Sequence, residues 1–327
     1  MNALLGWLIT TLVIALSGAL LGSVIGSAAL AWMGRRVASI EPGRRLWILR
    51  GVAWLPAMLA VVFMGVAYYP TLLDLMGIAA DHCRSHPGHT LHLCFVHYPP
   101  PEISLVVTLG FLGVLAAITR HWWVQWRGVR RGRRWTSQLV DVATYDEAVD
   151  AYVVDSDRLL ALTTGFFRPR ILVSNRLLRT LTPSQCDAVL AHEQAHRRRF
   201  DSLHWLVTAL VAVLYWPTIR QQLLDAIDLA SEQLCDEVAA QAVDDRLTVA
   251  EAILAVAGAR QEVSAPDSIR YFGDTSIEQR VQALVDDDWR YPGGPWVVLL
   301  AAALLVVLMT NLHLLHHWLE YTLAWLL

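Results

Sequence analysis

The 327-residue sequence contains no lysine, so its 26 basic residues are all arginine, and this absence by itself says little about mechanism. Only 17% of the residues are charged, whereas soluble globular proteins carry about 25%. A net charge of −3 gives no global basic field, and we expect no direct nucleic-acid partner. The four cysteines include no CxxC pair, which argues against a cysteine-based zinc knuckle.

Apolar residues make up 55% of the chain and gather in a few long runs, which is typical of proteins that lie in a lipid bilayer. Four runs each have about the 20 residues that are needed to cross one. These runs are 4–33, 51–75, 103–123 and 295–315. The first run is longer than the core of a cleavable signal and no basic segment precedes it, so we expect a membrane helix there.

Arginine placement predicts how the spans are oriented. One group lies between the first two spans and another follows the third. By the positive-inside rule both groups face the cytoplasm of a bacterial inner membrane, so that both chain ends lie outside. The chain then divides into a three-helix region 1–123 with a cytoplasmic loop 34–50 and an outer loop 76–102, a cytoplasmic domain 124–290, and a region 291–327 with the fourth helix and a short outer tail.

The segment 124–290 is long enough to bury its own core. Short β-prone runs predict strands at 151–154, 160–164 and 170–174. Apolar and amphipathic patterns predict helices from 183 to about 199, at 203–216, 218–243, 249–261 and 277–285. The run 203–216 is short for a span, so we expect a buried or membrane-dipping helix.

His192, Glu193 and His196 form an HExxH motif on the helix that Thr182 is expected to cap. Histidines four residues apart face the same way on a helix and hold one Zn²⁺, while the glutamate between them serves as general base. Glu232, on a later helix, is the candidate third ligand. Asp236, one turn further, can accept a hydrogen bond from a ligating histidine. An ordinary solvent-facing acidic surface is the alternative for these last two residues.

The predicted strands stand just before the metal helix, and zinc peptidases commonly bind their substrate as an added strand. The candidate edge consists of Leu160, Ala161, Leu162, Thr163 and Thr164. Its alternative is an ordinary half-buried strand. The predicted chemistry is amide hydrolysis, in which zinc acidifies water and Glu193 carries the proton to the leaving amine. The three arginines 197–199 suit the carboxyl end of the helix, where we expect them to be solvated.

Over about 150–285 these motifs resemble the membrane peptidases typified by the BlaR/MecR antirepressors, which are beta-lactam sensor-transducers. The resemblance lies in the string from Gly165 to Ser174, in HExxH followed by Asp201, and in Glu232-x-x-Cys235-Asp236. It implies that His192, His196 and Glu232 bind zinc, that Asp201 and Asp236 support them, and that Glu193 is the base. It also implies a cytosolic protein substrate, often a transcriptional repressor such as a winged-helix protein, cleaved when an outer signal is sensed.

The expected fold class is therefore a multi-pass α-helical membrane protein with an inserted α+β zincin-like (gluzincin) cytoplasmic domain. The antirepressors carry a penicillin-binding domain after the fourth span, but only about a dozen residues follow it here, so we do not expect beta-lactam sensing. Two alternatives stay open: a quality-control membrane protease and a catalytically silent receptor or scaffold. Glu193 argues against the second, because a purely structural site has no use for a general base.

The predicted outer loop combines five histidines with two cysteines. In an oxidising exterior Cys83 and Cys94 would form a disulfide, and the histidines would bind a metal ion or respond to pH. The histidines are His82, His86, His89, His92 and His97. The alternative is a solvated, disulfide-closed connector. In the first span, glycines at 18, 22 and 26 form a smooth stripe that suits helix packing and would permit a homodimer, although glycine is also common in membrane helices.

Overall fold

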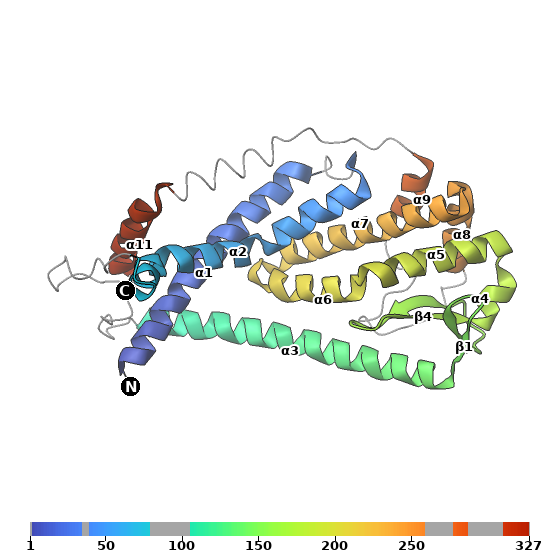
Figure 1. Cartoon of the computed structure of the whole chain (residues 1–327), viewed down its shortest axis with the longest axis horizontal. Coiled ribbons are helices and arrows are strands. Elements are labelled where there is room, and N and C mark those ends of the chain that lie inside the picture. The colour runs from blue at the N-terminus through green and yellow to red at the C-terminus, as the bar shows by residue number, and fades with distance from the viewer. Residues whose placement is uncertain (1, 35–38, 79–104, 259–276, 287–309, 327) are drawn as a thin grey trace.

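The computed structural model describes residues 2–34, 39–78, 105–258, 277–286 and 310–326. This part of the chain is mostly helical, with one four-stranded sheet (Figure 1). Its elements in chain order are α1 (Asn2–Met33), α2 (Pro42–Leu75), α3 (Leu105–Val142), β1 (Thr144–Asp146), β2 (Ala151–Val154), β3 (Ala161–Thr164), β4 (Arg170–Ser174), α4 (Asn175–Thr180), α5 (Pro183–Arg199), α6 (Asp201–Val211), η3 (Ala212–Leu214), α7 (Pro217–Val243), α8 (Arg246–Gly258), α9 (Ile277–Val285) and α11 (Leu312–Leu326).

Among the described residues, two helices are long and apolar enough to cross a membrane: Gly6–Met33 within α1, and α2. The helix α2 begins at Pro42, well before the predicted start at residue 51. Glu41 caps it by accepting hydrogen bonds from the backbone N–H groups of Gly43 and Arg44, both 3.1 Å long. Part of the predicted connecting segment 34–50 is therefore helical, because apolarity marks only part of this helix and not its charged first turns.

The glycine stripe of α1 faces other parts of the same chain: Gly18 and Gly22 face α2, and Gly26 faces Tyr215. A Cβ atom added at Gly18 would lie 2.6 Å from the carbonyl oxygen of Leu59, and one at Gly22 would lie 2.5 Å from the Cα atom of Pro56. The absent side chains thus let the two backbones approach closely. Since α2 fills this face, the stripe gives no support to the predicted homodimer.

The helix α3 continues far beyond the predicted span 103–123. Its 38 residues extend it to Val142, which gives a length of roughly 57 Å at 1.5 Å per residue. Figure 1 shows it following one side of the molecule from the membrane helices to the sheet. Near its end, Trp135 and Leu139 pack on Leu162 and Leu172 of the sheet. The helix thus goes on for about 19 residues beyond the apolar run, and this part supports the sheet.

The strand order is β1-β2-β4-β3, with β2 parallel to β4 and the other pairs antiparallel. The predicted strands 151–154 and 170–174 are confirmed, and the third begins one residue later than predicted, at Ala161. The exposed strand β1 and the short helix α4 were not predicted. In this order β3 is an edge strand, as the sequence predicted for 160–164.

The open side of β3 carries unused backbone groups. The backbone N–H of Ser174 donates to the carbonyl of Leu160 over 2.9 Å. Because hydrogen-bonded pairs alternate along an antiparallel ladder, this bond directs the N–H and C=O groups of Leu162 and Thr164 toward β4. Those of Ala161 and Thr163 consequently point away from the sheet.

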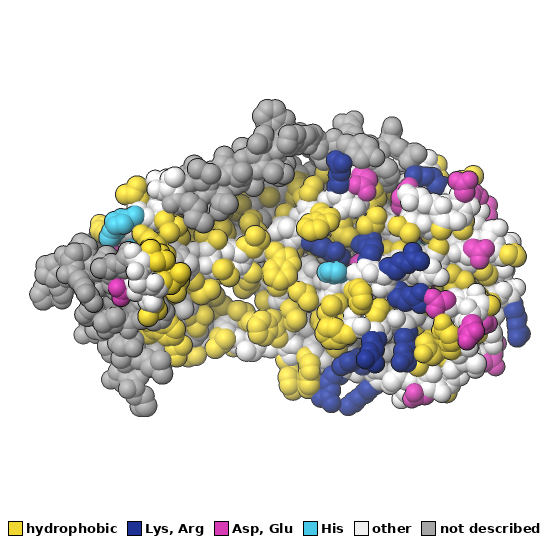
Figure 2. Space-filling model, viewed as in Figure 1, with side chains coloured by type: hydrophobic (Ala, Val, Ile, Leu, Met, Phe, Trp, Pro, Cys, Tyr) yellow, Lys and Arg dark blue, Asp and Glu magenta, His cyan; other side chains and the backbone are white. Residues whose placement is uncertain are grey.

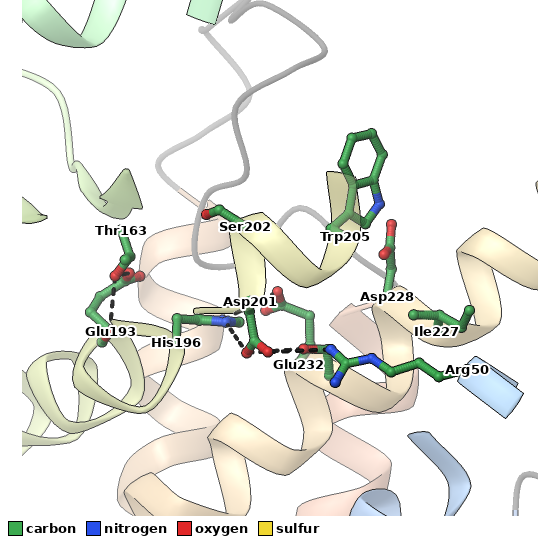
Figure 3. Close-up of a pocket in the computed structure, with 11 residues that line it drawn as sticks. Arg50, Thr163, Glu193, His196, Asp201, Ser202, Trp205, Ile227, Asp228 and Glu232 are labelled. Carbon is green, nitrogen blue, oxygen red and sulfur yellow. Dashed lines mark hydrogen bonds and ion pairs between the residues drawn. The ribbon is translucent and has the colours of Figure 1, made fainter. Parts of the chain in front are cut away.

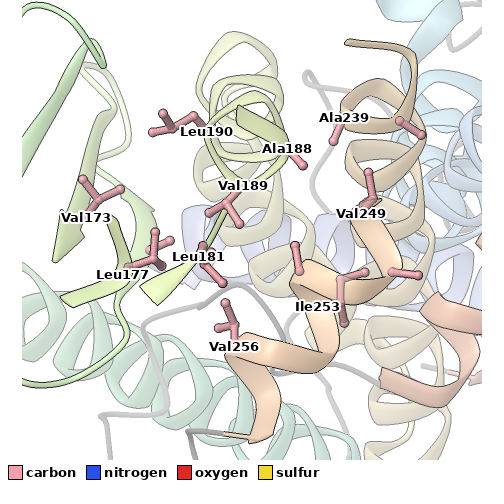
Figure 4. Close-up of a cluster of buried hydrophobic side chains, with 14 of the residues drawn as sticks. Val173, Leu177, Leu181, Ala188, Val189, Leu190, Ala239, Val249, Ile253 and Val256 are labelled. Carbon is pink, nitrogen blue, oxygen red and sulfur yellow. The ribbon is translucent and has the colours of Figure 1, made fainter. Parts of the chain in front are cut away.

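The helix α5 lies between the sheet and the helices α7 and α8, and this sandwich contains the main core (Figure 4). The fully buried members that fill it share small or branched side chains, and they include Ile171, Val173, Leu177, Ala188, Val189, Ala239, Val249, Ala252, Ile253 and Val256. A second apolar cluster joins the start of α2 to α7. Its buried residues are Leu46, Leu49, Ala53, Tyr215, Leu223, Ile227 and Ala230.

The apolar run 203–216 forms α6 and η3, which turn back into α7. The tip of this hairpin is held from two sides. Tyr215 donates a hydrogen bond to the carbonyl of Val52 on α2, and the Trp122 indole on α3 donates to the carbonyl of Leu210 over 3.2 Å. On the face drawn in Figure 2, hydrophobic side chains cover the end of the molecule that holds α1, α2 and α11, and arginines gather over the other half.

Candidate metal centre

The HExxH motif lies in the second half of α5, and local sequence fixes where this helix begins and ends. Thr182 and Gln185 form a reciprocal capping box, and Pro183 occupies the first helical position, as predicted. Phe200 adopts a left-handed conformation with φ of 52°, which stops α5 and starts α6 in a new direction. Asp201 is therefore brought back beside the last turn of α5.

Three side chains from two helices converge on one point: two imidazoles and one carboxylate. The Nε2 atoms of His192 and His196 lie 3.1 Å apart. From α7, one oxygen of Glu232 lies 3.4 Å from Nε2 of His196, and the other lies 3.5 Å from Nε2 of His192. A tetrahedral zinc with bonds of about 2.0–2.1 Å would place its ligand atoms roughly 3.3 Å apart. The three donors therefore have the spacing that a shared zinc ion requires.

Both histidines are oriented by carboxylates on their other ring nitrogen. The Nδ1 of His192 lies 2.9 Å from an oxygen of Asp236, and the Nδ1 of His196 is hydrogen-bonded to Asp201 over 2.9 Å. A neutral imidazole that keeps its proton on Nδ1 presents a lone pair at Nε2. Both lone pairs then point at each other, which is favourable only with a cation between them. The residues present thus fit a bound metal ion.

A layer of charged groups surrounds these ligands. Asp236 accepts hydrogen bonds from the Nε and an Nη of Arg280 over 2.8 and 2.6 Å, and Arg280 also lies 3.1 Å from Glu232. Asp201 accepts a hydrogen bond from Ser231 over 3.2 Å. Its other oxygen contacts Arg199 at 3.2 Å and Arg50, from the candidate membrane helix α2, at 3.4 Å.

The charges explain the ionisation of the site. Burial raises the pKa of a carboxyl group, but Arg280 overrides this effect and holds the pKa of Glu232 and Asp236 below the usual range. Burial lowers the pKa of His196, but Cys235, Glu232 and Asp201 around the ring raise it well above its usual range. The same surplus of negative potential that favours a proton on His196 also attracts a metal cation.

Glu193 lies beside these ligands and is held from the sheet. The hydroxyl of Thr163 on β3 donates to a carboxylate oxygen of Glu193 over 2.7 Å and lies 2.9 Å from its backbone carbonyl (Figure 3). The carboxylate is 2% exposed but lines a pocket with His196 and Glu232. The remaining lining residues come from α2, α6 and α7, and they include Arg50, Ser202, Trp205, Ile227 and Asp228.

The structure thus brings together all the predicted inner residues: the HExxH side chains, Glu232, Asp236, Asp201 and the strand β3. The predicted outer histidines and the two cysteines of that loop lie outside the described residues. Of the arginines expected to be solvated, Arg198 is exposed. The other two are half-buried and paired, Arg197 with Asp150 and Arg199 with Asp201.

Arg50 and Arg280 were not predicted as site residues. Arg280 lies on the buried face of α9, between Ile277 and Leu284. An arginine among the apolar positions of an amphipathic helix can be noticed in the sequence, and it could have indicated a buried charge. Arg50 had no comparable signal, because its place at the site depends on how α2 packs against α7.

An HExxH helix that meets a carboxylate from a second helix, preceded by two apolar helices, defines the class of membrane-associated metallopeptidases. Residues 102–284, more than half of the chain, match the family model described as BlaR1 peptidase M56, and the chain belongs to this family. The resemblance recognised in the sequence is thereby confirmed. Membership implies peptidase activity that depends on a metal ion. No curated protein matches the chain.

Proposed function

We propose that this protein is a zinc-dependent endopeptidase of a bacterial inner membrane that cleaves a cytosolic protein in response to a signal outside the cell. The observation that carries the zinc assignment is the convergence of His192, His196 and Glu232. The two Nε2 atoms lie 3.1 Å apart, and the two oxygens of Glu232 lie 3.4 Å from Nε2 of His196 and 3.5 Å from Nε2 of His192. Their carboxylate partners Asp236 and Asp201 hold both imidazoles in the tautomer that binds metal. A zinc ion held there supplies Lewis acidity and makes water a nucleophile near neutral pH.

Glu193 is the general base in this proposal. Its carboxylate takes the proton of the attacking water and later returns it to the leaving amine. Thr163 occupies one carboxylate oxygen of Glu193 by its hydrogen bond, which leaves the other free to face the pocket. The hydroxyl thus orients the base without competing for the proton that the base must take.

The strand β3 is the proposed substrate-binding edge. An extended peptide that pairs with the outward backbone groups of Ala161 and Thr163 would run past Glu193, because the Thr163 side chain touches that residue. The resemblance to antirepressors supports a transcriptional repressor of the winged-helix type as substrate. The alternative of a quality-control protease uses the same site and differs only in its substrates.

The gathering of arginines beside the site supports a cytoplasmic active site, with both chain ends and the loop 76–102 outside. The proposed sensor is that loop, with its histidines and a Cys83–Cys94 disulfide. The histidines 313, 316 and 317 belong to α11, where His316 and His317 lie 3.3 and 3.4 Å from Glu320.

The decisive experiment compares the wild-type chain with Glu193→Gln in lipid nanodiscs loaded with zinc. The substrate is a peptide library from digested bacterial cytosol, with new termini mapped by mass spectrometry. We expect the variant to retain zinc and to cleave at least about 100-fold more slowly, because a general base contributes about 10²–10⁴ in rate. Glu251→Gln, an exposed change on α8, is the control and should cleave normally.

The outcomes separate the alternatives. A wild-type chain that binds zinc but produces no new termini would support the scaffold alternative. Equal cleavage by the wild type and Glu193→Gln would refute the assigned base. A wild-type chain that binds no zinc would overturn the proposal as a whole.

A further inference from the structure

Arg280 is the largest fully buried side chain outside the apolar core, and it contacts the candidate ligand set at two places. Its Nε and one Nη donate to the two oxygens of Asp236 over 2.8 and 2.6 Å. Its other Nη lies 3.1 Å from an oxygen of Glu232. Two nitrogens of the guanidinium are thus hydrogen-bonded to Asp236, and the third lies at ion-pair distance from Glu232 on the same helix.

The body of α9 holds this guanidinium in place. Ile277, Val281 and Leu284 pack into the main core, where α9 contacts α8 and α7. A guanidinium is planar and its donors have fixed directions. The orientation of α9 therefore fixes the positions of both carboxylates.

We propose that Arg280 is a positioning residue of the metal centre, which holds Glu232 directly and His192 through Asp236. The contact to one oxygen of Glu232 leaves the other, 3.4 Å from His196, to face the metal position. Glu232 then binds through one oxygen, and a coordination position stays open for water. Two of the three candidate ligands depend on this one side chain.

An ion pair that only neutralised charge would not require an arginine in contact with two carboxylates. One carboxylate is enough to pair one arginine, and a lysine would neutralise the site as well. Only the planar guanidinium of an arginine can donate to both oxygens of Asp236 and also bring a third nitrogen close to Glu232. The distinction is testable, because charge and geometry respond differently to a lysine substitution.

This inference rests on the proposed zinc site. The experiment uses the full chain in nanodiscs, with zinc affinity measured against a competing chelator and site geometry measured from the visible spectrum of the cobalt-substituted protein. We expect Arg280→Lys to weaken zinc binding about 10- to 100-fold, the usual effect of losing a group that orients a ligand, and to change the cobalt spectrum. We expect kcat to fall while KM stays constant, because the strand β3 is untouched.

Arg246→Lys is the matched control. Arg246 pairs with Glu237 on α7 over 2.7 Å, away from the ligands, so its zinc affinity and cobalt spectrum should equal the wild type. If Arg280→Lys does not fold, the double variant Arg280→Met with Asp236→Asn removes charge and countercharge together, and it should fold yet bind zinc weakly.

Three results would overturn the proposal. In the first, a folded Arg280→Lys binds zinc with wild-type affinity and an unchanged cobalt spectrum. In the second, neither variant folds, which would make Arg280 a residue of the fold alone. In the third, the wild type itself binds no zinc, and the proposed function fails with it.

Discussion

At the scale of single residues, the metal centre consists of candidate ligands and of the side chains around them, and these two groups have different tasks. The inner atoms must present lone pairs, and the outer groups must hold protons and charges that keep those lone pairs aimed. Asp236 and Asp201 do this for the two histidines. Arginines supply the balancing charge in each case, Arg280 to Asp236 and Arg199 to Asp201. Removing one member therefore leaves a buried charge without compensation, which is costly.

The hydroxyl of Thr163 gives a prediction at this scale. We expect Thr163→Val to lower kcat about 10- to 100-fold, because a hydrogen bond to a charged group contributes about 1.5–3 kcal/mol. Zinc affinity should not change, since Thr163 contacts the base and not a ligand. Steady-state cleavage and zinc titration check both parts. Thr164→Val is the control, because successive side chains of a strand face opposite sides; an equal loss of kcat there would contradict the role of Thr163.

At the scale of elements, the close approach of α1 and α2 depends on glycine. We expect Gly22→Ala to destabilise the helix pair by about 1–3 kcal/mol, because its Cβ would lie 2.5 Å from the Cα of Pro56, a backbone atom that cannot move aside. The apparent melting temperature in detergent measures the effect.

Gly65→Ala on α2 is the matched control, since nothing lies within 4 Å of its added Cβ. It should be neutral or slightly stabilising, because alanine is the better helix former. A melting temperature for Gly22→Ala equal to that of Gly65→Ala would show that the two helices do not pack as described.

At the scale of the whole molecule, the site is not confined to the segment 124–290. The helix α2 contributes Arg50 to the pocket and buries Leu223 and Ile227 of α7. A fragment 124–290 would expose that apolar face of α7 and lose a charged contact of Asp201. We therefore expect the fragment to self-associate and to bind zinc at least about 10-fold more weakly than the full chain, the lower end of the loss that follows removal of a supporting group.

Size-exclusion chromatography and zinc titration test this prediction. Arg50→Gln in the full chain separates the two effects: it should weaken zinc binding without self-association, because the apolar interface stays intact. A monomeric fragment with the affinity of the full chain would mean that α2 serves the membrane and not the site. If α2 does serve both, a shift of this helix within the bilayer reaches His196 through Asp201.

Local patterns were enough to predict much of this protein. The HExxH spacing, the capping box of Thr182 and Gln185, and the β-prone runs within 151–174 each depend on neighbours within a few residues, and they predicted α5, β2, β4 and the edge strand β3. The apolar runs predicted the helices α1 and α2, but α2 begins before its apolar run and α3 continues beyond its own, because hydropathy reports the surroundings of a helix and not its hydrogen bonding.

Tertiary structure alone decided which distant residues meet. Arg50 and Arg280 lie 230 positions apart in the sequence, yet packing of α2 and α9 on α7 directs both toward the same charged layer. It also turned Gly18 and Gly22 of α1 toward α2. The sequence by itself determined the ligand chemistry, since residue type and helical spacing are local properties. The supporting charges follow from burial and helix packing, which are properties of the whole fold.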